Sequence, residues 1–373
     1  MTPAMLPQAG KTPELDSEVE THPVSAATPR FVALGGGTGL PNVLRGLRPF
    51  LYGTGDDRRQ QLTSREHLVA IVATSDDGGS SGRLRAEFNV IPPGDIRNCL
   101  AALSENHALI ADLFQYRFGA GGALDGHAVG NLVLTALADV TQDFAQAVEI
   151  AARIVGARGT VLPATRELVT LVAEFEDGHV MSGETAIAAA GRRIARVSLL
   201  PDRPQCVPGA CEALLRADVI IAGPGSLFTS ILPPLLVPDV AASIIGSKAT
   251  RILVANLMTE PGETDDYSIL EHVLTIERHL GAQLFDYVIY NTSPVPEDLM
   301  AAYATRGARP IATGSFELSA LEKLGVQPIG VPLVSEHPPG KIRHHPDRLA
   351  TVIAALAQGK IGAWRARPDP TGP

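Results

Sequence analysis

The chain is poor in cysteine, and its three cysteines follow no metal-binding pattern. Among 373 residues only Cys99, Cys206 and Cys211 carry thiols, and no two of them form a CxxC pair. A zinc site or the disulfide framework of a secreted protein needs more cysteines at recognisable spacings. We therefore expect three free thiols in a reducing compartment, which indicates a cytoplasmic protein.

Long apolar runs and an excess of basic residues are also missing. No stretch of 18 apolar residues occurs, and the first 30 residues lack the basic and apolar regions of a secretion signal. The net charge is −9, and only five of the 31 basic residues are lysines. Because proteins that bind nucleic acid usually carry the opposite balance, we expect neither nucleic-acid binding nor membrane insertion.

The residues that are present alternate between short apolar segments and longer amphipathic ones. Apolar residues make up 45% of the chain and charged residues 19%, a composition typical of a soluble globular protein. Strands are predicted over residues 31–34, 68–73, 194–200, 219–222, 252–255 and 285–290, with a hairpin over 168–182. Helices are predicted over residues 40–47, 96–103, 128–138, 143–155, 266–280, 296–306 and 346–358. This alternation predicts an α/β fold with a mostly parallel sheet that helices cover on both faces.

Two glycine-rich loops each follow a predicted strand and precede a helix. The first consists of Gly35, Gly36, Gly37, Thr38 and Gly39; the second consists of Gly223, Pro224, Gly225 and Ser226. Bare backbone amides at a helix start suit a phosphate group, and ligands of open α/β sheets lie beyond the carboxyl ends of the strands. The two loops together favour a nucleotide-sized phosphorylated ligand, although a single such loop is equally typical of a tight turn without a ligand.

Adjacent carboxylates follow the strand at 68–73. Asp76 and Asp77 precede a run of glycine and serine that includes Ser80 and Ser81. One of the carboxylates could hold Mg²⁺, act as a base or accept a bond from a ribose hydroxyl. The alternative is an Asx turn made of good turn formers. Since neighbouring side chains point apart in regular structure, we do not expect both to serve the same purpose.

Other polar residues mark the starts of two predicted helices. Asp95, Arg97 and Asn98 lie together at one start, where Arg97 could pair with a phosphate and Asp95 is expected to cap the helix. His127 and Asn131 lie one turn apart at another start. A histidine in this setting is more typical of a capping or packed residue than of a catalyst.

Two later segments complete the set of candidates. Residues 256–264 follow a predicted strand, so Asn256 and Thr259 either line the same crevice or belong to a simple turn. His344 and His345 belong to no metal-binding pattern, and we expect them at the surface.

Six of these segments occur in the same order in one protein family. The sequence resembles the bacterial gluconeogenesis factor family (YvcK-like), within the superfamily of 2-phospho-L-lactate transferase (CofD-like), from about residue 31 to about residue 355. The segments that carry the resemblance are 35–40, 76–85, 92–98, 126–131, 223–230 and 256–259. Pro234 and His345 depart from the family pattern, where Asn and Asp are expected.

The resemblance implies a Rossmann-like core and a cytoplasmic UDP-sugar-binding protein that supports cell shape and wall synthesis on gluconeogenic carbon sources. The alternative that it implies is a Mg²⁺-dependent transferase of a phosphoryl-linked group, like 2-phospho-L-lactate transferase. No reaction is assigned to this branch, so catalytic residues are unknown, with Asp76 and Asp77 as candidates. A third interpretation, NAD-dependent redox chemistry, lacks the GxGxxG spacing and the acidic residue that follows it.

Under this interpretation the glycine loops hold the diphosphate, and Asn256 and Thr259 meet the base or ribose. The sugar- or phosphate-facing set consists of Asp77, Ser80, Ser81, Arg97, Asn98, His127 and Asn131, with Mg²⁺ at Asp76 or Asp77 as an option.

The expected organisation is a disordered leader (1–29), one nucleotide-binding domain (30–363) with an inserted helical and hairpin lobe at about 100–200, and a frayed tail (364–373). Expected partners are the nucleotide sugar, regulators of cell-wall synthesis and a second copy of the chain.

Overall fold

The computed structural model describes residues 28–53, 64–104, 108–119, 121–335 and 340–359. The expected frayed tail and nearly all of the expected leader lie outside these residues. Within them, seven parallel strands form the main sheet, in the spatial order β10-β9-β8-β7-β1-β2-β3. Their bounds are β1 Phe31–Gly35, β2 Leu68–Val72, β3 Thr160–Pro163, β7 Val219–Ala222, β8 Thr250–Val254, β9 Tyr287–Asn291 and β10 Gln327–Val331. The predicted α/β fold with a mostly parallel sheet is confirmed.

Strand β1 lies inside the sheet between β7 and β2, and all five of its residues are buried. In register, Phe31 pairs with Leu68 of β2 on one side and with Val219 of β7 on the other. Side chains alternate between the two faces of a strand, so Phe31 packs into one hydrophobic core and Val32 into the other. A strand buried on both faces is read as a continuous apolar run, which is why β1, β2 and β7 were recognisable in the sequence.

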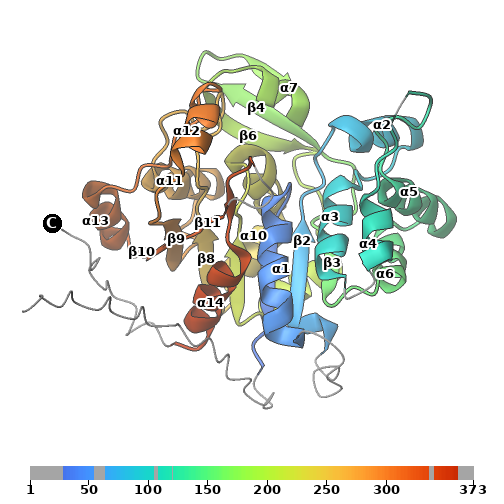
Figure 1. Cartoon of the computed structure of the whole chain (residues 1–373), viewed down its shortest axis with the longest axis horizontal. Helices are drawn as coiled ribbons and strands as arrows, with labels where there is room; N and C mark the ends of the chain where they lie inside the picture. The colour runs from blue at the N-terminus through green and yellow to red at the C-terminus, as the bar shows by residue number, and fades with distance from the viewer. Residues whose placement is uncertain (1–27, 54–63, 105–107, 120, 336–339, 360–373) are drawn as a thin grey trace, which may run out of the picture.

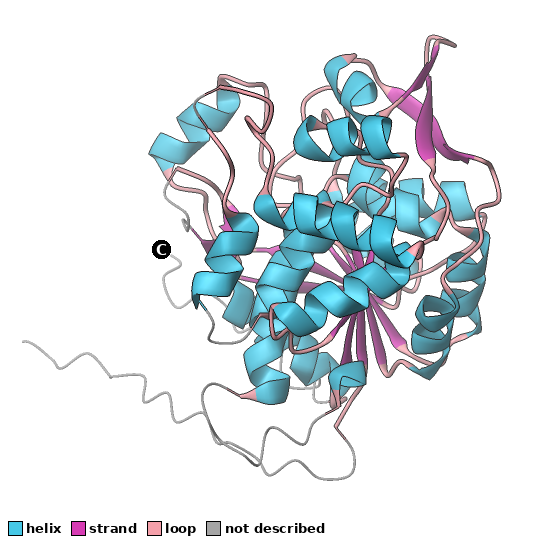
Figure 2. Cartoon of the chain, turned by 90° about the vertical axis from the view of Figure 1, so that its right-hand side faces the viewer, coloured by secondary structure: helices cyan, strands magenta, loops and turns pink. Residues whose placement is uncertain are grey.

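Helices cover both faces of the main sheet (Figures 1 and 2). One core includes residues of α1 (Gly39–Tyr52), α3 (Gly94–Leu103), α5 (Val129–Thr141), α6 (Phe144–Ile154) and α14 (Pro346–Ala357). The opposite core includes residues of α8 (Pro208–Arg216), α10 (Pro238–Gly246) and α11 (Ile269–Leu280). The remaining helices include α2 (Gly79–Phe88), α4 (Ala108–Gln115), α7 (Glu184–Ala189), α9 (Leu232–Leu235), α12 (Glu297–Ala304) and α13 (Ser315–Lys323).

The segment at about 100–200 contains both helices and a small sheet. After α4, α5 and α6 the chain returns to the main sheet as β3, and it then forms an antiparallel sheet of β5 (Val180–Ser182), β4 (Thr170–Phe175) and β6 (Ile194–Leu200). This small sheet lies above the main sheet in Figure 1. The predicted hairpin and the predicted strand at 194–200 are confirmed.

Some boundaries and elements differ from the sequence prediction. Helix α11 begins at Ile269 rather than at 266, because Ser268 and Glu271 form a capping box that fixes its start. Strands β3 and β10 were not predicted. Both are short and contain a proline, which weakens the sequence signal of a strand.

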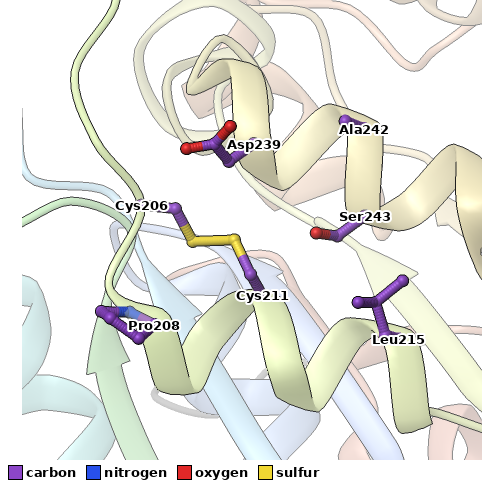
Figure 3. A pocket seen from close by; sticks show the side chains of 7 residues that line it. All are labelled: Cys206, Pro208, Cys211, Leu215, Asp239, Ala242 and Ser243. Carbon is purple, nitrogen blue, oxygen red and sulfur yellow. A yellow bond between two sulfur atoms is a disulfide. The ribbon is translucent and has the colours of Figure 1, made fainter.

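Two of the three cysteines are joined, so the prediction of three free thiols is wrong. Cys206 lies just before α8 and Cys211 within its first turns, and the disulfide between them spans a Cα–Cα distance of 6.6 Å (Figure 3). The helical turn folds the chain back and brings the two side chains together, which the absence of a CxxC spacing did not reveal. Cys99 is buried and is the free cysteine of the described residues.

Within the described residues no single helix has the length and apolar character to cross a membrane. One pair, Leu227–Leu235 with Pro238–Gly246, reaches that length and character only when the two helices are taken together, and it is bent by 74°.

Candidate functional site

The strand order reverses between β1 and β7. From β1 the chain continues through β2 to β3 in one direction, and from β7 it continues through β8 and β9 to β10 in the other. Ligands of open α/β sheets bind outside the carboxyl ends of the strands at such a switch point. The two glycine loops, 35–39 and 223–226, are the segments that follow these two strands.

The two glycine loops pack backbone against backbone. A Cβ on Gly39 would overlap the Pro224 carbonyl oxygen and lie 2.6 Å from its carbonyl carbon. A Cβ on Gly225 would lie 3.2 Å from the Cβ of Ser230. Glycine at these positions therefore lets the two loops approach each other more closely than residues with a side chain would allow.

Asp95 supports the first loop instead of capping its own helix. The Gly37 N–H donates to Asp95 Oδ2 at 2.6 Å, whereas the residue before α3 is Pro93, whose side chain cannot accept a hydrogen bond. The expected capping role of Asp95 is therefore wrong, because its side chain is turned under the loop and not toward the amides of α3. Burial is the main cause that raises the pKa of Asp95 to about 6.

The second loop is held by polar side chains that follow β8. The Gly225 N–H donates to Asn256 Oδ1 at 3.0 Å, and the Ser226 hydroxyl donates to Glu263 Oε2 at 2.6 Å. Burial raises the pKa of Glu263, and burial followed by the nearby Glu263 charge raises the pKa of Glu260 to about 7. Glu260 is thus partly protonated at neutral pH, and it lies beside the loop together with Glu263.

Asn256 and Thr259, both predicted to meet a base or ribose, have different surroundings. Thr259 is buried, and its hydroxyl accepts a bond from the Arg309 N–H at 2.9 Å, so it fastens its segment to the neighbouring chain. Asn256 lines a cavity of about 630 Å³ at the carboxyl ends of β8 and β9. Tyr290, Asn291 and Thr313 also line this cavity.

These other cavity residues were not predicted as site residues. The sequence did contain one signal for them, since Tyr290 and Asn291 lie at the end of the strand predicted over 285–290. Polar residues at the carboxyl end of this strand indicate a position in the crevice, just as the loops at the ends of the strands at 31–34 and 219–222 do.

Asp76 and Asp77 point in different directions, as neighbouring residues were expected to do. One oxygen of Asp76 accepts the Gly78 N–H at 2.9 Å, which is the Asx turn considered as the alternative. Asp77 Oδ1 accepts both the N–H and the hydroxyl of Thr185, at 2.8 and 2.7 Å. Asp77 therefore ties the end of β2 to the start of α7 in the small-sheet lobe.

Glu184 joins the acidic residues from the opposite side, and nothing in the sequence had indicated it. Burial, followed by the charges of Asp76 and Asp95, raises the pKa of Glu184 to about 9. The Ser75 hydroxyl donates to Glu184 Oε2 at 3.5 Å. A carboxyl that keeps its proton at neutral pH is a hydrogen-bond donor in this part of the crevice.

Among the described residues no three His, Cys, Asp or Glu side chains are grouped so that they could hold a metal ion. Mg²⁺ at Asp76 or Asp77 stays a prediction.

The other predicted sugar- or phosphate-facing residues form a buried polar cluster next to this acidic group. Asn131 Nδ2 donates to Ser80 Oγ at 3.0 Å, and Ser80 Oγ lies 3.0 Å from His127 Nδ1. Ser81 Oγ accepts the Gly94 N–H at 3.1 Å and joins α2 to α3. Arg97 is 5% exposed, and its Nη2 donates to Asn98 Oδ1 at 2.8 Å.

His344 is buried, so its expected surface position is wrong. It ends the short strand β12 (Arg343–His344), and its Nε2 lies 3.0 Å from the Ala255 carbonyl oxygen, directly before Asn256. Burial lowers the pKa of His344 to about 4, which keeps the ring neutral. The burial of His344 depends on this contact with Ala255, which is 89 residues away in the sequence, so a local pattern could not predict it.

The sheet order, the helices on both faces and the paired loops at the switch point define a Rossmann-like α/β protein. The family model described as 2-phospho-L-lactate transferase CofD matches residues 31–334. The gluconeogenesis factor of Bacillus subtilis is 40% identical over 328 residues, which are 88% of this chain and 98% of that protein. The gluconeogenesis factor of Listeria monocytogenes is 40% identical over 328 residues, which are 88% of this chain and 95% of that protein.

A crystal structure of a UPF0052-family protein from Bacillus halodurans superimposes with a TM-score of 0.80. Its sequence is 39% identical, and the match covers 87% of this chain and 99% of that one. The chain belongs to the CofD family, together with these gluconeogenesis factors.

Proposed function

We propose that the protein is a gluconeogenesis factor that binds a UDP-sugar at the carboxyl edge of its main sheet. Two relatives at 40% identity are gluconeogenesis factors, which supports the first part of this proposal. The observation that carries the second part is the backbone contact between the loops at 35–39 and 223–226, at the point where the strand order reverses.

The ligand lies along the edge from β8 to β2. The base and ribose occupy the cavity beside Asn256, and the diphosphate follows the two glycine loops. The sugar then reaches toward Asp76, Arg97 and His127. The three strand-to-strand steps from β8 to β2 span about 14 Å, which suits an extended nucleoside diphosphate that carries one sugar.

The acidic residues beside the loops need not repel a diphosphate. The pKa of Asp95 is raised to about 6 and that of Glu260 to about 7, so both carboxyls can take up a proton at modest cost when an anion arrives. A divalent cation such as Mg²⁺ would have the same effect. Affinity that falls as the pH rises from 6 to 8, and that recovers with Mg²⁺, is the expected behaviour.

A second candidate function is Mg²⁺-dependent transfer of a phosphoryl-linked group from a nucleotide diphosphate carrier. The description of the family model supports it, and so does the protonated Glu184 beside Asp76, a pair that could move a proton. Recovery of an intact UDP-sugar after long incubation would count against this candidate. Turnover that disappears in Asp76→Asn would favour it.

In the cell, we place the protein in the cytoplasm, where it couples nucleotide-sugar levels to cell shape and wall synthesis during growth on gluconeogenic carbon sources. Regulators of wall synthesis and a second copy of the chain are its proposed partners. Deletion of the gene should impair growth on a gluconeogenic carbon source and spare growth on glucose. A complementing copy with an impaired ligand site should not restore growth.

The binding site is tested by calorimetric titration of Gly225→Val with UDP-N-acetylglucosamine. A side chain here approaches Ser230 and displaces the loop amide that Asn256 holds, so we expect affinity to fall by about 10-fold or more. Gly119→Val is the matched control, because a Cβ at Gly119 meets no atom within 4 Å. Equal affinity of the two variants would contradict the site.

A further inference from the structure

Arg97 is a buried cation whose hydrogen-bonding capacity is mostly unused. Its side chain is 5% exposed, and its Nε and Nη1 atoms have no partner among the described residues. Within the described residues, its Nη2 donates a hydrogen bond to Asn98 Oδ1 at 2.8 Å. A buried guanidinium that is left without acceptors costs stability, so an anion that accepted its hydrogen bonds would be bound favourably.

The carboxylates nearby do not compensate it. Asp95 and Asp76 lie close enough to raise the pKa of Arg97, yet neither accepts a hydrogen bond from it. Asp95 is bonded to Gly37, and one oxygen of Asp76 is bonded to Gly78. Each carboxylate thus has one oxygen bonded to a backbone N–H, and the guanidinium gains no hydrogen bond from either.

A second cation increases the demand for an anion at this place. After burial, the Arg117 guanidinium is the largest cause that lowers the pKa of Arg97. Burial, the Arg83 guanidinium and the Arg117 guanidinium likewise lower the pKa of His127. A neutral His127 leaves its Nε2 as a donor when Nδ1 accepts from Ser80.

An unpartnered acceptor lies in the same cluster. Asn131 is 1% exposed, and its Oδ1 has no partner among the described residues. Gly130, the residue before it, packs against the stem of Arg97, where a Cβ would lie 2.8 Å from Arg97 Cγ. Donors for an anion and an acceptor for a hydroxyl are thus adjacent, which matches an acidic sugar.

We infer that Arg97, with Arg117, His127 and Asn131 around it, forms a subsite for an anionic group, a carboxylate or phosphate, at the end of the ligand remote from the base. The anion takes the place of Asn98 Oδ1 and bonds the guanidinium, while Asn131 Oδ1 accepts a hydroxyl of the same ligand. The placement of the anion at the sugar end rests on the proposed function. The anionic character of the bound group is inferred from Arg97 and does not depend on that function.

The test compares two probes that differ in one group. UDP-glucuronate carries a carboxylate where UDP-glucose carries a hydroxymethyl group. We expect the wild type to bind UDP-glucuronate about 10- to 100-fold more tightly by calorimetry. In Arg97→Met the preference should vanish, because the affinity for UDP-glucuronate falls by much more than the affinity for UDP-glucose. Inorganic phosphate, measured by its stabilisation of the protein against heat, should also lose its effect in Arg97→Met.

The matched control is Arg216→Met, which removes an exposed arginine paired with Glu212 on α8 and should keep both anion responses. If tight binding of UDP-glucuronate depends on Arg97, the subsite binds a carboxylate of the ligand. If only the stabilisation by inorganic phosphate depends on Arg97, the subsite binds a free anion. Either result supports the subsite. Anion responses that persist in Arg97→Met overturn it. If no UDP-sugar binds the wild type while the phosphate response still depends on Arg97, the proposed function fails and the subsite stands.

Stability separates this role from a structural one. Removing an unpaired buried charge should leave the melting temperature of the ligand-free protein unchanged or raised, whereas loss of a structural contact should lower it. A lowered melting temperature with unaltered anion binding overturns the inference. If Arg97→Met does not fold, the exposed Arg117→Ala variant provides the same comparison, with a smaller expected loss of anion affinity.

Discussion

The contact between Gly39 and Pro224 gives the sharpest test of the loop geometry. In Gly39→Ala the new methyl group would overlap the Pro224 carbonyl oxygen, and it would lie 2.6 Å from the carbonyl carbon and 3.2 Å from the Gly225 nitrogen. All three atoms are backbone, so no side chain can rotate away to make room. The two loops must separate, or α1 must shift on the sheet.

The expected cost follows from the balance of two effects. Forcing a methyl group into a packed region costs about 1–3 kcal/mol, whereas replacing glycine by alanine within a helix gains up to about 1 kcal/mol. Gly39 is the first residue of α1, so the gain is small there and the overlap dominates. For a domain of this size, we expect the melting temperature to fall by roughly 1–4 °C.

The assay is thermal unfolding of Gly39→Ala beside Gly119→Ala, followed by titration with UDP-N-acetylglucosamine. Gly119 has open space around it, so its variant controls for the loss of glycine flexibility. The control should be as stable as the wild type and bind as well. Equal stability and affinity of the two variants would refute the claim that the loops touch.

Three further predictions concern the acidic residues and the cysteines. Burial, followed by the surrounding carboxylates, raises the pKa of Glu184 from 4.5 to about 9, so the free energy of unfolding of the wild type falls as the pH rises through that window. In denaturant unfolding, Glu184→Gln should therefore become increasingly more stable than the wild type as the pH rises. Asp77→Ala removes the acceptor of two Thr185 donors, so it should cost about 1 kcal/mol and speed amide exchange at the start of α7. Alkylation in denaturant without reductant should label Cys99 alone, and alkylation after reduction should label three cysteines by mass.

Each of these predictions has a clear contrary result. The exposed Glu322→Gln should show no comparable change with pH, and an equal pH response of the two Gln variants would contradict the burial of Glu184. Unaltered exchange at α7 would contradict the role of Asp77. Three labelled thiols before reduction would contradict the disulfide and restore the original prediction.

The fold and the glycine loops could be predicted because their signals are local. Strands β1 and β7 are short apolar runs with glycine at or just after their carboxyl ends, and the helices that follow show apolar residues at helical spacing. A parallel α/β sheet then places the two loops at one edge by its topology alone. Helix α11 was also predicted, although its start was placed three residues early, because the capping box of Ser268 and Glu271 was not used.

The supports of the site could not be predicted, because they join residues far apart in sequence. Gly37 and Asp95 are 58 residues apart, and Asp77 and Thr185 are 108 residues apart. Glu184 acquires its raised pKa only when the small-sheet lobe folds over the carboxyl edge. Local rules instead favoured a cap for Asp95, since an acidic residue at a helix start usually serves that purpose.

The central claim is that one UDP-sugar spans the edge from β8 to β2, and a crystal structure of the protein with UDP-N-acetylglucosamine tests it most directly. The account predicts the uracil in the cavity beside Asn256, the diphosphate against the loops at 35–39 and 223–226, and the sugar next to Arg97 and His127. A ligand bound elsewhere, or one whose diphosphate lies away from both glycine loops, would contradict it.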